Sequence, residues 1–205
     1  MVMEQRANHL IYDPLRDRFI ITIPSSDIET GNSLGFLDPA DGEFTALHFV
    51  GSEPDPLALT DDGDYVYVGV NGAAVLKRFN MTTNQVDLLL EMGYAAPNAP
   101  LMAGSIDCQP GTNSTIAVSK YGAGSEFPFE TSVYADGVER DLSVSSGYEC
   151  DFIRFKAGTP DRLLGVNYTN GFYRLRTFSV SPGRRTDLEP TAKPLRGQWF
   201  RIRDV

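Results

Sequence analysis

Four segments of the chain share one pattern, in which a short turn precedes an alternating apolar run. They are DPLRDRFIITI at 13–23, TDDGDYVYVGV at 60–70, QPGTNSTIAVS at 109–119 and KAGTPDRLLGVN at 156–167. Aligning Phe19, Tyr65, Thr115 and Arg162 gives offsets of 46, 50 and 47 residues. Self-similarity at such a period is typical of repeat architectures, in which each repeat is one supersecondary unit. The period therefore restricts the fold more than any other feature of the chain.

Each repeat is predicted to contain four short strands. In the second repeat they span 56–60, 64–70, 73–81 and 85–91, which are rich in β-branched and aromatic residues. Asn or Asp followed by Gly favours a tight type I′ hairpin, because both residues adopt positive φ at low cost. Such dipeptides occur at Asp41-Gly42, Asn71-Gly72, Asp136-Gly137 and Asn170-Gly171. Four-stranded antiparallel units at this period predict an all-β fold, a β-propeller.

The repeats predict a single domain over 1–205, with about four blades at 8–50, 56–92, 103–144 and 150–190. RGQWFRIRDV at 196–205 is interpreted as the first strand of a fifth blade. A seven-bladed ring at this period needs about 300 residues, so the chain corresponds to a partial propeller. We expect it to be a fragment of a longer propeller, or to cover its open blade edges by self-association. A closed four- or five-bladed ring is the alternative.

Several motifs resemble one known family of propellers. LALTDDGDYVYVGVNGAAVLKRFNMTTNQV resembles the YVTN-type, lactonase-like repeats of bacterial seven-bladed propellers. HLIYDPLRDRFIITIPSS, NSLGFLDPADGEF, GSEPDPLALTDDG, GSIDCQPGTNSTIAVS and SVYADGVERD extend the resemblance over about 8–181. It implies a secreted or cell-surface bacterial protein, often with immunoglobulin-like or anchoring modules beside the propeller. The matching residues belong to turns and strand cores, so the resemblance implies a fold and not an activity.

Composition argues against two classes of partner. The chain has 27 acidic and 18 basic residues and a formal net charge of −9, whereas nucleic-acid binding needs a basic stripe for phosphates. No apolar run approaches the roughly 18 residues of a membrane-spanning helix, and the N-terminus lacks the apolar region of a signal peptide. We therefore expect no nucleic-acid partner and no membrane insertion. The missing signal peptide means that the protein stays inside the cell or that an upstream part is absent from this chain, and only the resemblance implies a parent protein outside the cell or on its surface.

Metal and cofactor sites lack their usual residues. Cys108 and Cys150 have no CxxC spacing, and their offset on parallel inner strands, roughly 13 Å, exceeds disulfide reach. His9 and His48 are predicted to be surface or packing residues. Asp61-Asp62-Gly63-Asp64 lacks calcium-loop spacing and is predicted to be a turn. We predict no metal and no cofactor, and a single tryptophan argues against quinone-cofactor propellers, which repeat a tryptophan motif.

Two functional hypotheses remain open. The first is a non-catalytic binding or scaffold module with a protein or glycan ligand. The alternative is a lactonase-like hydrolase acting at the mouth of the propeller channel, where Asp107, Asp151 and Arg154 are predicted to lie on or near inner strands. No G-x-S-x-G elbow or P-loop occurs, so no catalytic residue is assigned.

A binding rim is predicted on the loops that join second to third strands and blade to blade. IPSSDIETGNS, GYAAPNAP and SKYGAGSEFPFETS belong to these loops, which usually carry function in such folds. The candidate binding residues are Asp27, Glu53, Asp55, Asn98, Tyr121, Glu126, Tyr148 and Glu149. Most of the other aromatic residues are predicted to pack between blades, among them Phe152, Phe172 and Tyr173, whereas Phe127 and Phe129 belong to the rim loop SKYGAGSEFPFETS.

Overall fold

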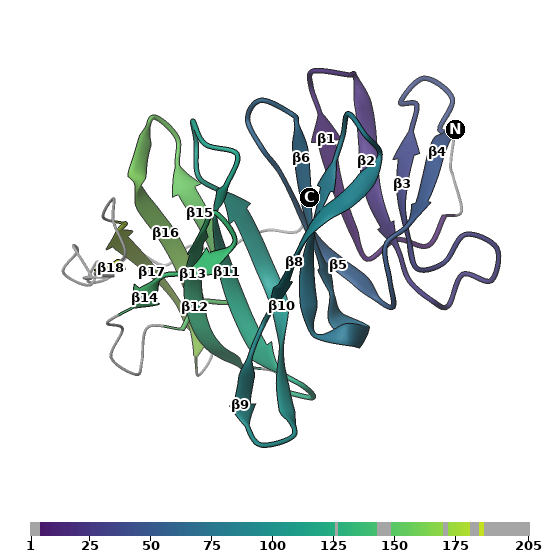
Figure 1. Cartoon of the computed structure of the whole chain (residues 1–205). Helices are drawn as coiled ribbons and strands as arrows, with labels where there is room; N and C mark the ends of the chain where they lie inside the picture. Colours follow the sequence, from purple (N-terminus) through teal and green to yellow (C-terminus); the bar gives the residue numbers. More distant parts are fainter. Residues whose placement is uncertain (1–4, 126, 143–148, 170–171, 181–184, 187–205) are drawn as a thin grey trace.

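The computed structural model describes residues 5–125, 127–142, 149–169, 172–180 and 185–186. The described chain is all-β, and its one helical segment is the short 3₁₀ helix η1 (Asn71–Ala73). Three principal sheets have four or more strands and a fourth has three, with the strands of each antiparallel. The sheets stand beside one another as an arc of blades (Figure 1), which confirms the predicted partial β-propeller.

The first two blades are regular four-stranded sheets with strands in chain order. The first contains β1 (His9–Asp13), β2 (Arg18–Ile23), β3 (Ser33–Leu37) and β4 (Phe44–Phe49). The second contains β5 (Pro54–Leu59), β6 (Tyr65–Val70), β7 (Val75–Asn80) and β8 (Gln85–Glu91).

The other two blades depart from that pattern. The third contains β10 (Ala99–Cys108), β11 (Thr115–Gly122), β12 (Pro128–Ala135) and β13 (Val138–Glu139), with β9 (Tyr94–Ala96) added beside β10. The fourth contains β15 (Phe152–Lys156), β16 (Thr159–Thr169) and β17 (Phe172–Ser179). A short parallel pair joins β14 (Asp141–Leu142) to β18 (Arg185–Thr186). The predicted fifth-blade strand at 196–205 lies outside the described residues.

Side-chain alternation explains how the blades pack. In the second blade, Val66 and Val68 share a buried cluster with Ile20 and Phe36 of the first blade. Tyr67, between them on β6, turns instead to the cluster shared with the third blade. A strand with both faces buried between neighbouring sheets reads as a nearly continuous apolar run, as YVYVGV does.

Registers correct the predicted repeat alignment by one residue. Tyr12 pairs with Phe19, and the corresponding pair in the third blade is Cys108 with Ile116. Phe19 therefore occupies the place of Ile116, not that of Thr115. A slip of one residue moves every side chain to the opposite sheet face, so this correction decides which side chains face which neighbour. The equivalent residues in the second and fourth blades are Val66 and Leu163.

Of the predicted hairpin turns, Asp136-Gly137 has the positive φ angles of a type I′ turn, 52° and 80°. The hairpin at Asn71-Gly72 joins β6 to β7 as predicted, but its type I′ turn was wrong, since these residues form η1 and the positive φ falls on Ala74. The Asn71 amide donates to the carbonyl of Ala103 in the next blade, at 3.1 Å, so a tertiary contact outweighs local turn preference. Asp41-Gly42 lies in a wider connection, and 170–171 are outside the described residues.

Both cysteines are free, as predicted, and both are buried. Phe155 occupies the register position of Cys108, so Cys150 lies five residues from that position along its strand direction. The predicted register was therefore wrong by one residue, and the separation it implied is larger. Within the described residues, no helix is long and apolar enough to cross a bilayer.

Candidate functional site

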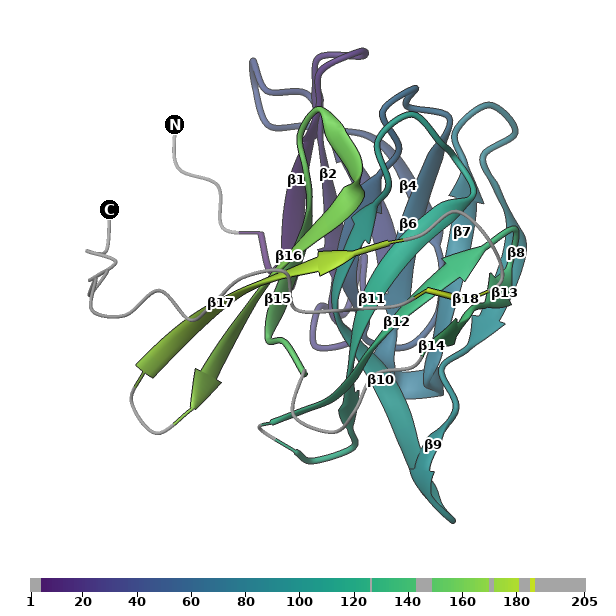
Figure 2. The ribbon, with the colours of Figure 1, turned by 90° about the vertical axis from the view of Figure 1, so that its left-hand side faces the viewer.

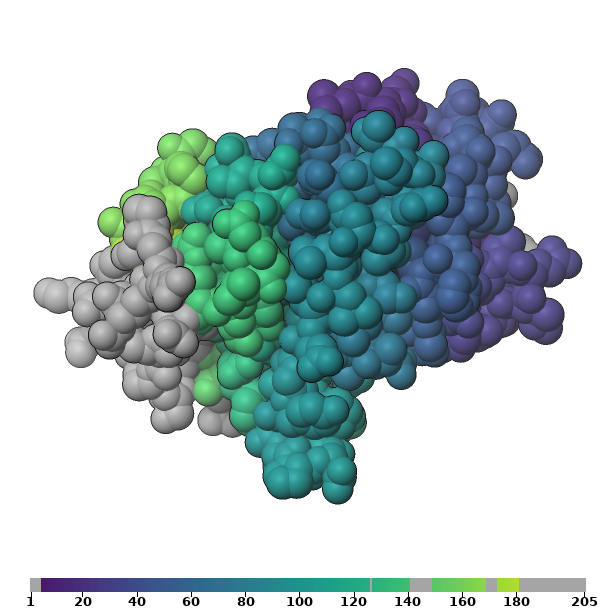
Figure 3. Space-filling view, in the orientation of Figure 1, coloured from purple at the N-terminus to yellow at the C-terminus, as the bar shows by residue number. Residues whose placement is uncertain are grey.

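The propeller has two ends with different connections. The turn face carries the connections at 14–17, 60–64, 109–114 and 157–158, each joining the first strand of a blade to the second. The loop face carries 24–32, 50–53, 71–74 and 97–98, and in Figure 1 it lies at the bottom. The hairpin of β9 and β10 projects from this face as an arm, which the space-filling view also shows (Figure 3).

The innermost strands of all four blades surround one cavity of about 300 Å³. β1 contributes Asn8 and His9 at its start, β5 contributes Asp55 and Pro56, and the other two strands supply the remaining wall. The lining residues from those two strands are Gly104, Ser105, Ile106, Phe152, Ile153 and Arg154. Since the first strand of each blade lines the axis of a propeller, this cavity is the described part of the central channel.

Backbone N–H groups of the inner strands of the second and fourth blades are hydrogen-bonded to side chains of the blade before them. The backbone N–H of Leu57 donates to His9 Nδ1 at 2.7 Å, and that of Phe155 donates to Asp107 Oδ2 at 2.6 Å. His9 therefore carries its proton on Nε2 when neutral. Burial and the nearby Arg154 lower the His9 pKa, so the ring is a neutral donor.

Asp55 also lines the cavity, but its carboxylate makes no such hydrogen bond to a neighbouring blade. No bond joins it to a described residue, and burial raises its pKa to about 6. Across the cavity, Arg154 bonds to Asp107 Oδ1 at 2.6 Å, so its charge is already matched. Above about pH 6 the cavity thus contains one uncompensated negative charge beside a neutral histidine.

The carboxylates predicted for a hydrolase serve as links between strands. Asp107 uses both oxygens, one for Arg154 and one for the Phe155 backbone, and burial raises its pKa. Asp151 accepts bonds from the Tyr121 hydroxyl at 3.1 Å and from the backbone N–H of Tyr168. Neither oxygen pair is left free to act on a substrate in this arrangement.

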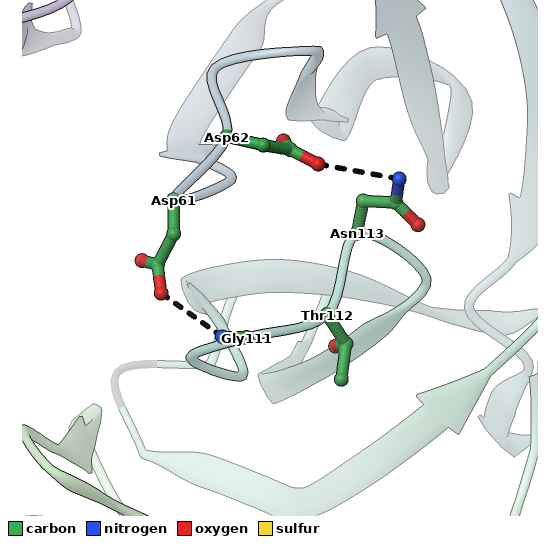
Figure 4. Close-up of a pocket in the computed structure, with 5 residues that line it drawn as sticks. All are labelled: Asp61, Asp62, Gly111, Thr112 and Asn113. Atoms are coloured by element: carbon green, nitrogen blue, oxygen red, sulfur yellow. Dashed lines mark hydrogen bonds between the residues drawn. The ribbon is translucent and has the colours of Figure 1, made fainter.

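A second hollow, of about 240 Å³, lies on the turn face between the second and third blades (Figure 4). Asp61 Oδ2 accepts from the Gly111 backbone at 3.0 Å, and Asp62 Oδ2 accepts from the Asn113 amide at 3.3 Å. Asp62 also caps its own turn through Thr60 and the backbone of Asp64. The predicted turn is confirmed, and among the described residues no group of three His, Cys, Asp or Glu side chains could hold a metal.

The structure distributes the predicted rim residues over several places. Asp27 folds its own loop by accepting from Thr30 and Glu29, and the bond from the Thr30 backbone is the largest cause of its lowered pKa. Glu53 accepts from the Ser25 hydroxyl, so these two loop-face connections of the first blade touch. Among the members of the set that the structure describes, Asp55 lines the channel cavity.

The others lie further around the arc. Asn98 is at the exposed tip of the β9–β10 hairpin, with φ of 63°. Tyr121 is half-buried at the end of β11, bonded to Asp151, and burial raises its pKa. Glu149 is half-buried before β15, and Glu126 and Tyr148 lie outside the described residues. Their binding role stays a prediction.

Exposed aromatic residues are what the sequence interpretation missed. Phe152 and Tyr173 were expected to pack between blades, yet they are 64% and 58% exposed. Phe127 and Phe129 lie in the loop that was predicted for the rim, and they are 65% and 44% exposed. Tyr94, on the arm of the third blade, is also exposed. Phe127 and Phe129 stand on either side of the buried Pro128 at the start of β12, and because residues two apart on a strand share one face, both point outward.

Comparisons with known proteins support the fold. No family model matches the chain, and no curated protein sequence matches it. Kuenenia stuttgartiensis hydrazine synthase is similar in structure over 91% of this chain, with a TM-score of 0.66 and 16% identity. The β-propeller domain of Myceliophteria thermophila Cps50 (Swd1) is similar over 87%, with a TM-score of 0.63 and 12% identity. U3-55K is similar over 89%, with a TM-score of 0.54 and 11% identity.

At such identities these similarities establish the fold alone. The chain covers 49%, 53% and 54% of the three solved chains, so it spans about half the length of each.

Proposed function

We propose that the chain is a non-catalytic binding module of a secreted or cell-surface bacterial protein, and that it holds a protein or glycan ligand at the channel cavity. The cavity supports this most directly, because the unpaired Asp55 carboxylate and the exposed Phe152 ring line the same hollow. At about 300 Å³ the cavity is at the small end of ligand pockets, large enough for one sugar ring or one side chain. The resemblance of the repeats to YVTN-type propellers supports the bacterial surface location.

A lactonase-like hydrolase is the second candidate, and Asp55 is the observation in its favour. A carboxyl with a pKa near 6 is suited to proton transfer at neutral pH, and His9 lies in the same cavity. The bonds of Asp107 and Asp151 count against it, because both carboxylates are committed to backbone and side-chain partners.

One variant separates the two functions. Asp55→Asn removes the charge and keeps the shape, and Asp136→Asn is the matched control on an exposed turn between β12 and β13. Binding is measured by ligand-observed NMR with glucose, galactose, glucosamine and short lysine or tyrosine peptides. Hydrolysis is measured with glucono-δ-lactone in a pH-stat.

For a binding module, at least one probe binds wild-type protein and the control, binds Asp55→Asn at least about tenfold more weakly, and no lactone is hydrolysed above background. Lactone turnover that Asp55→Asn abolishes would favour the hydrolase. Binding that both variants retain would move the ligand site away from the channel and contradict the proposal.

A further inference from the structure

The two end blades each present an apolar face that the inner blades bury. Leu10 of the first blade occupies the register position of Leu57 and Ile106, which are 0% and 2% exposed. Leu10 itself is 52% exposed and its neighbour Tyr12 is 47% exposed. Ile21, Ile23 and Leu37 form a separate apolar cluster on the same sheet and are only 0% to 5% exposed, so the open part of this surface is the strip around Leu10 and Tyr12. We call this surface the leading face.

The fourth blade has the opposite kind of open face. Phe152, Val166 and Leu175 form one cross-strand row on it, and Tyr168 pairs with Tyr173 beside that row. Phe152, Tyr168, Tyr173 and Leu175 are 47% to 64% exposed. Figure 2 shows that β16 and β17 extend away from the other sheets. We call this surface the trailing face.

These faces are complementary halves of an interface that the chain already makes three times. In every internal junction, the trailing side of one blade packs on the leading side of the next, as Ala117 and Val133 pack against Ile153 and Phe178. Within the described residues, the trailing face of the fourth blade and the leading face of the first each expose apolar side chains, and the two faces are of the kinds that pack together at the internal junctions. Apolar faces of this kind usually mark an interaction surface.

Charge favours the same pairing. Residues 9–49 contain two arginines and seven acidic residues, a formal charge of −5. Residues 152–179 contain five basic residues and one acidic residue, a formal charge of +4. A second copy of the chain thus presents an acidic first blade to a basic fourth blade.

We propose that two copies associate head to tail, the trailing face of each against the leading face of the other, and close an eight-bladed ring. Eight blades is within the range of known propellers, and the chain spans about half of the propeller chains it resembles. Two identical junctions related by a two-fold axis close the ring without free ends. The second copy also completes the wall of the channel cavity, and the association does not depend on which ligand binds there.

The test is the oligomeric state of the 205-residue chain, measured by size exclusion with light scattering and by sedimentation equilibrium. Leu10→Asp changes the leading face and Leu175→Asp changes the trailing face. Leu89→Asp, on β8 of the second blade, is the matched control because Leu89 is also 52% exposed. Circular dichroism and thermal melting verify that each variant folds.

We expect a wild-type dimer, an unchanged dimer for Leu89→Asp, and a dissociation constant at least about thirtyfold higher for each of the other two variants. A folded wild-type monomer would overturn the proposal. A dimer whose dissociation constant rises with only one of the Leu10→Asp and Leu175→Asp substitutions would also overturn it, because that result indicates pairing of like faces. A series of assemblies larger than the dimer would overturn it as well.

Discussion

Burial determines the chemistry of several single residues, and Asp55 illustrates how. Its pKa is about 6 in the folded chain, against an ordinary value of 3.8. Because the folded state favours the protonated carboxyl, Asp55 costs no stability below pH 3.8 and weakens the fold as pH rises through 6. Such a residue is retained at a cost in stability, which is typical of functional positions.

Asp55→Asn should therefore stabilise the protein at pH 7.5 by about 1 to 2 kcal/mol, because the neutral amide avoids desolvation of a charge. At pH 4 the difference should shrink to near zero, since Asp55 is then largely protonated. Urea unfolding at the two pH values measures both free energies. Equal effects at pH 4 and 7.5 would show that charge burial is not the cause.

The two thiols should be inert in the native protein. Burial raises the pKa of Cys150 to about 12 and that of Cys108 further, so neither thiolate forms near neutral pH. We expect a thiol reagent at pH 8 to modify less than about a tenth of the cysteine in an hour and both thiols at once in guanidinium. A native protein that reacts within minutes would contradict the buried placement.

Lys120 is a buried charge with three partners. Its ammonium lies 2.8 Å from Glu130, 2.9 Å from Glu139 and 5.3 Å from the centre of the Tyr134 ring. Lys120→Met keeps the volume but leaves two half-exposed carboxylates unpaired, and should destabilise the fold by about 1 to 3 kcal/mol. The exposed Lys156→Met should change stability by less than about 0.5 kcal/mol. Chemical denaturation of both variants makes the comparison, and equal effects would refute a special role for Lys120.

The sequence predicted the roles of some acidic residues but not of others. The acidic run at 61–64 was recognisable as a turn because its spacing failed the calcium-loop pattern. The Asp55 carboxylate has no bond to a described residue, whereas Asp107 links two blades. This difference depends on the three-dimensional neighbours of each carboxylate. No local pattern around either residue carries that information.

At the scale of elements, the period and the alternation predicted the strands of the second blade to within two residues at every end. β8 spans 85–91 as predicted, and β6 begins one residue later than predicted. The β9 strand was missed because GYAAPNAP lacks apolar alternation and contains two prolines. Its strand geometry comes from pairing with β10, a tertiary effect that short-range propensity does not encode.

At Gly104, the β10 backbone lies very close to the Tyr121 ring of β11. Gly104 lies at an irregularity in β10, and a Cβ there would overlap the Tyr121 ring. Gly104→Ala should displace that ring, weaken its bond to Asp151 and destabilise the protein by about 1 to 3 kcal/mol. Gly122→Ala on β11 is the control, because its Cβ would lie 3.9 Å from the nearest atom. Thermal and urea unfolding compare the two, and equal losses would show that the close approach is not the reason.

At the scale of the whole molecule, the sequence predicted a partial ring with open faces, and the structure supplies which side chains those faces expose. Composition alone showed an acidic chain. The opposite charges of the first and fourth blades become meaningful only when the strand register places those blades at the two ends of the arc.

Salt should therefore weaken the proposed head-to-tail association. The Debye length falls from about 10 Å at 0.1 M to about 3 Å at 1 M, which screens attraction between the end blades. We expect the wild-type dissociation constant to rise roughly threefold to tenfold over that range, while the apolar contact persists. Arg162→Glu, on the fourth blade, should dissociate more readily at 0.1 M and approach wild type at 1 M, because screening then removes repulsion as well as attraction. Sedimentation equilibrium at both salt concentrations measures this, and a wild-type constant that stays flat or falls with salt would mean that charge does not align the two copies.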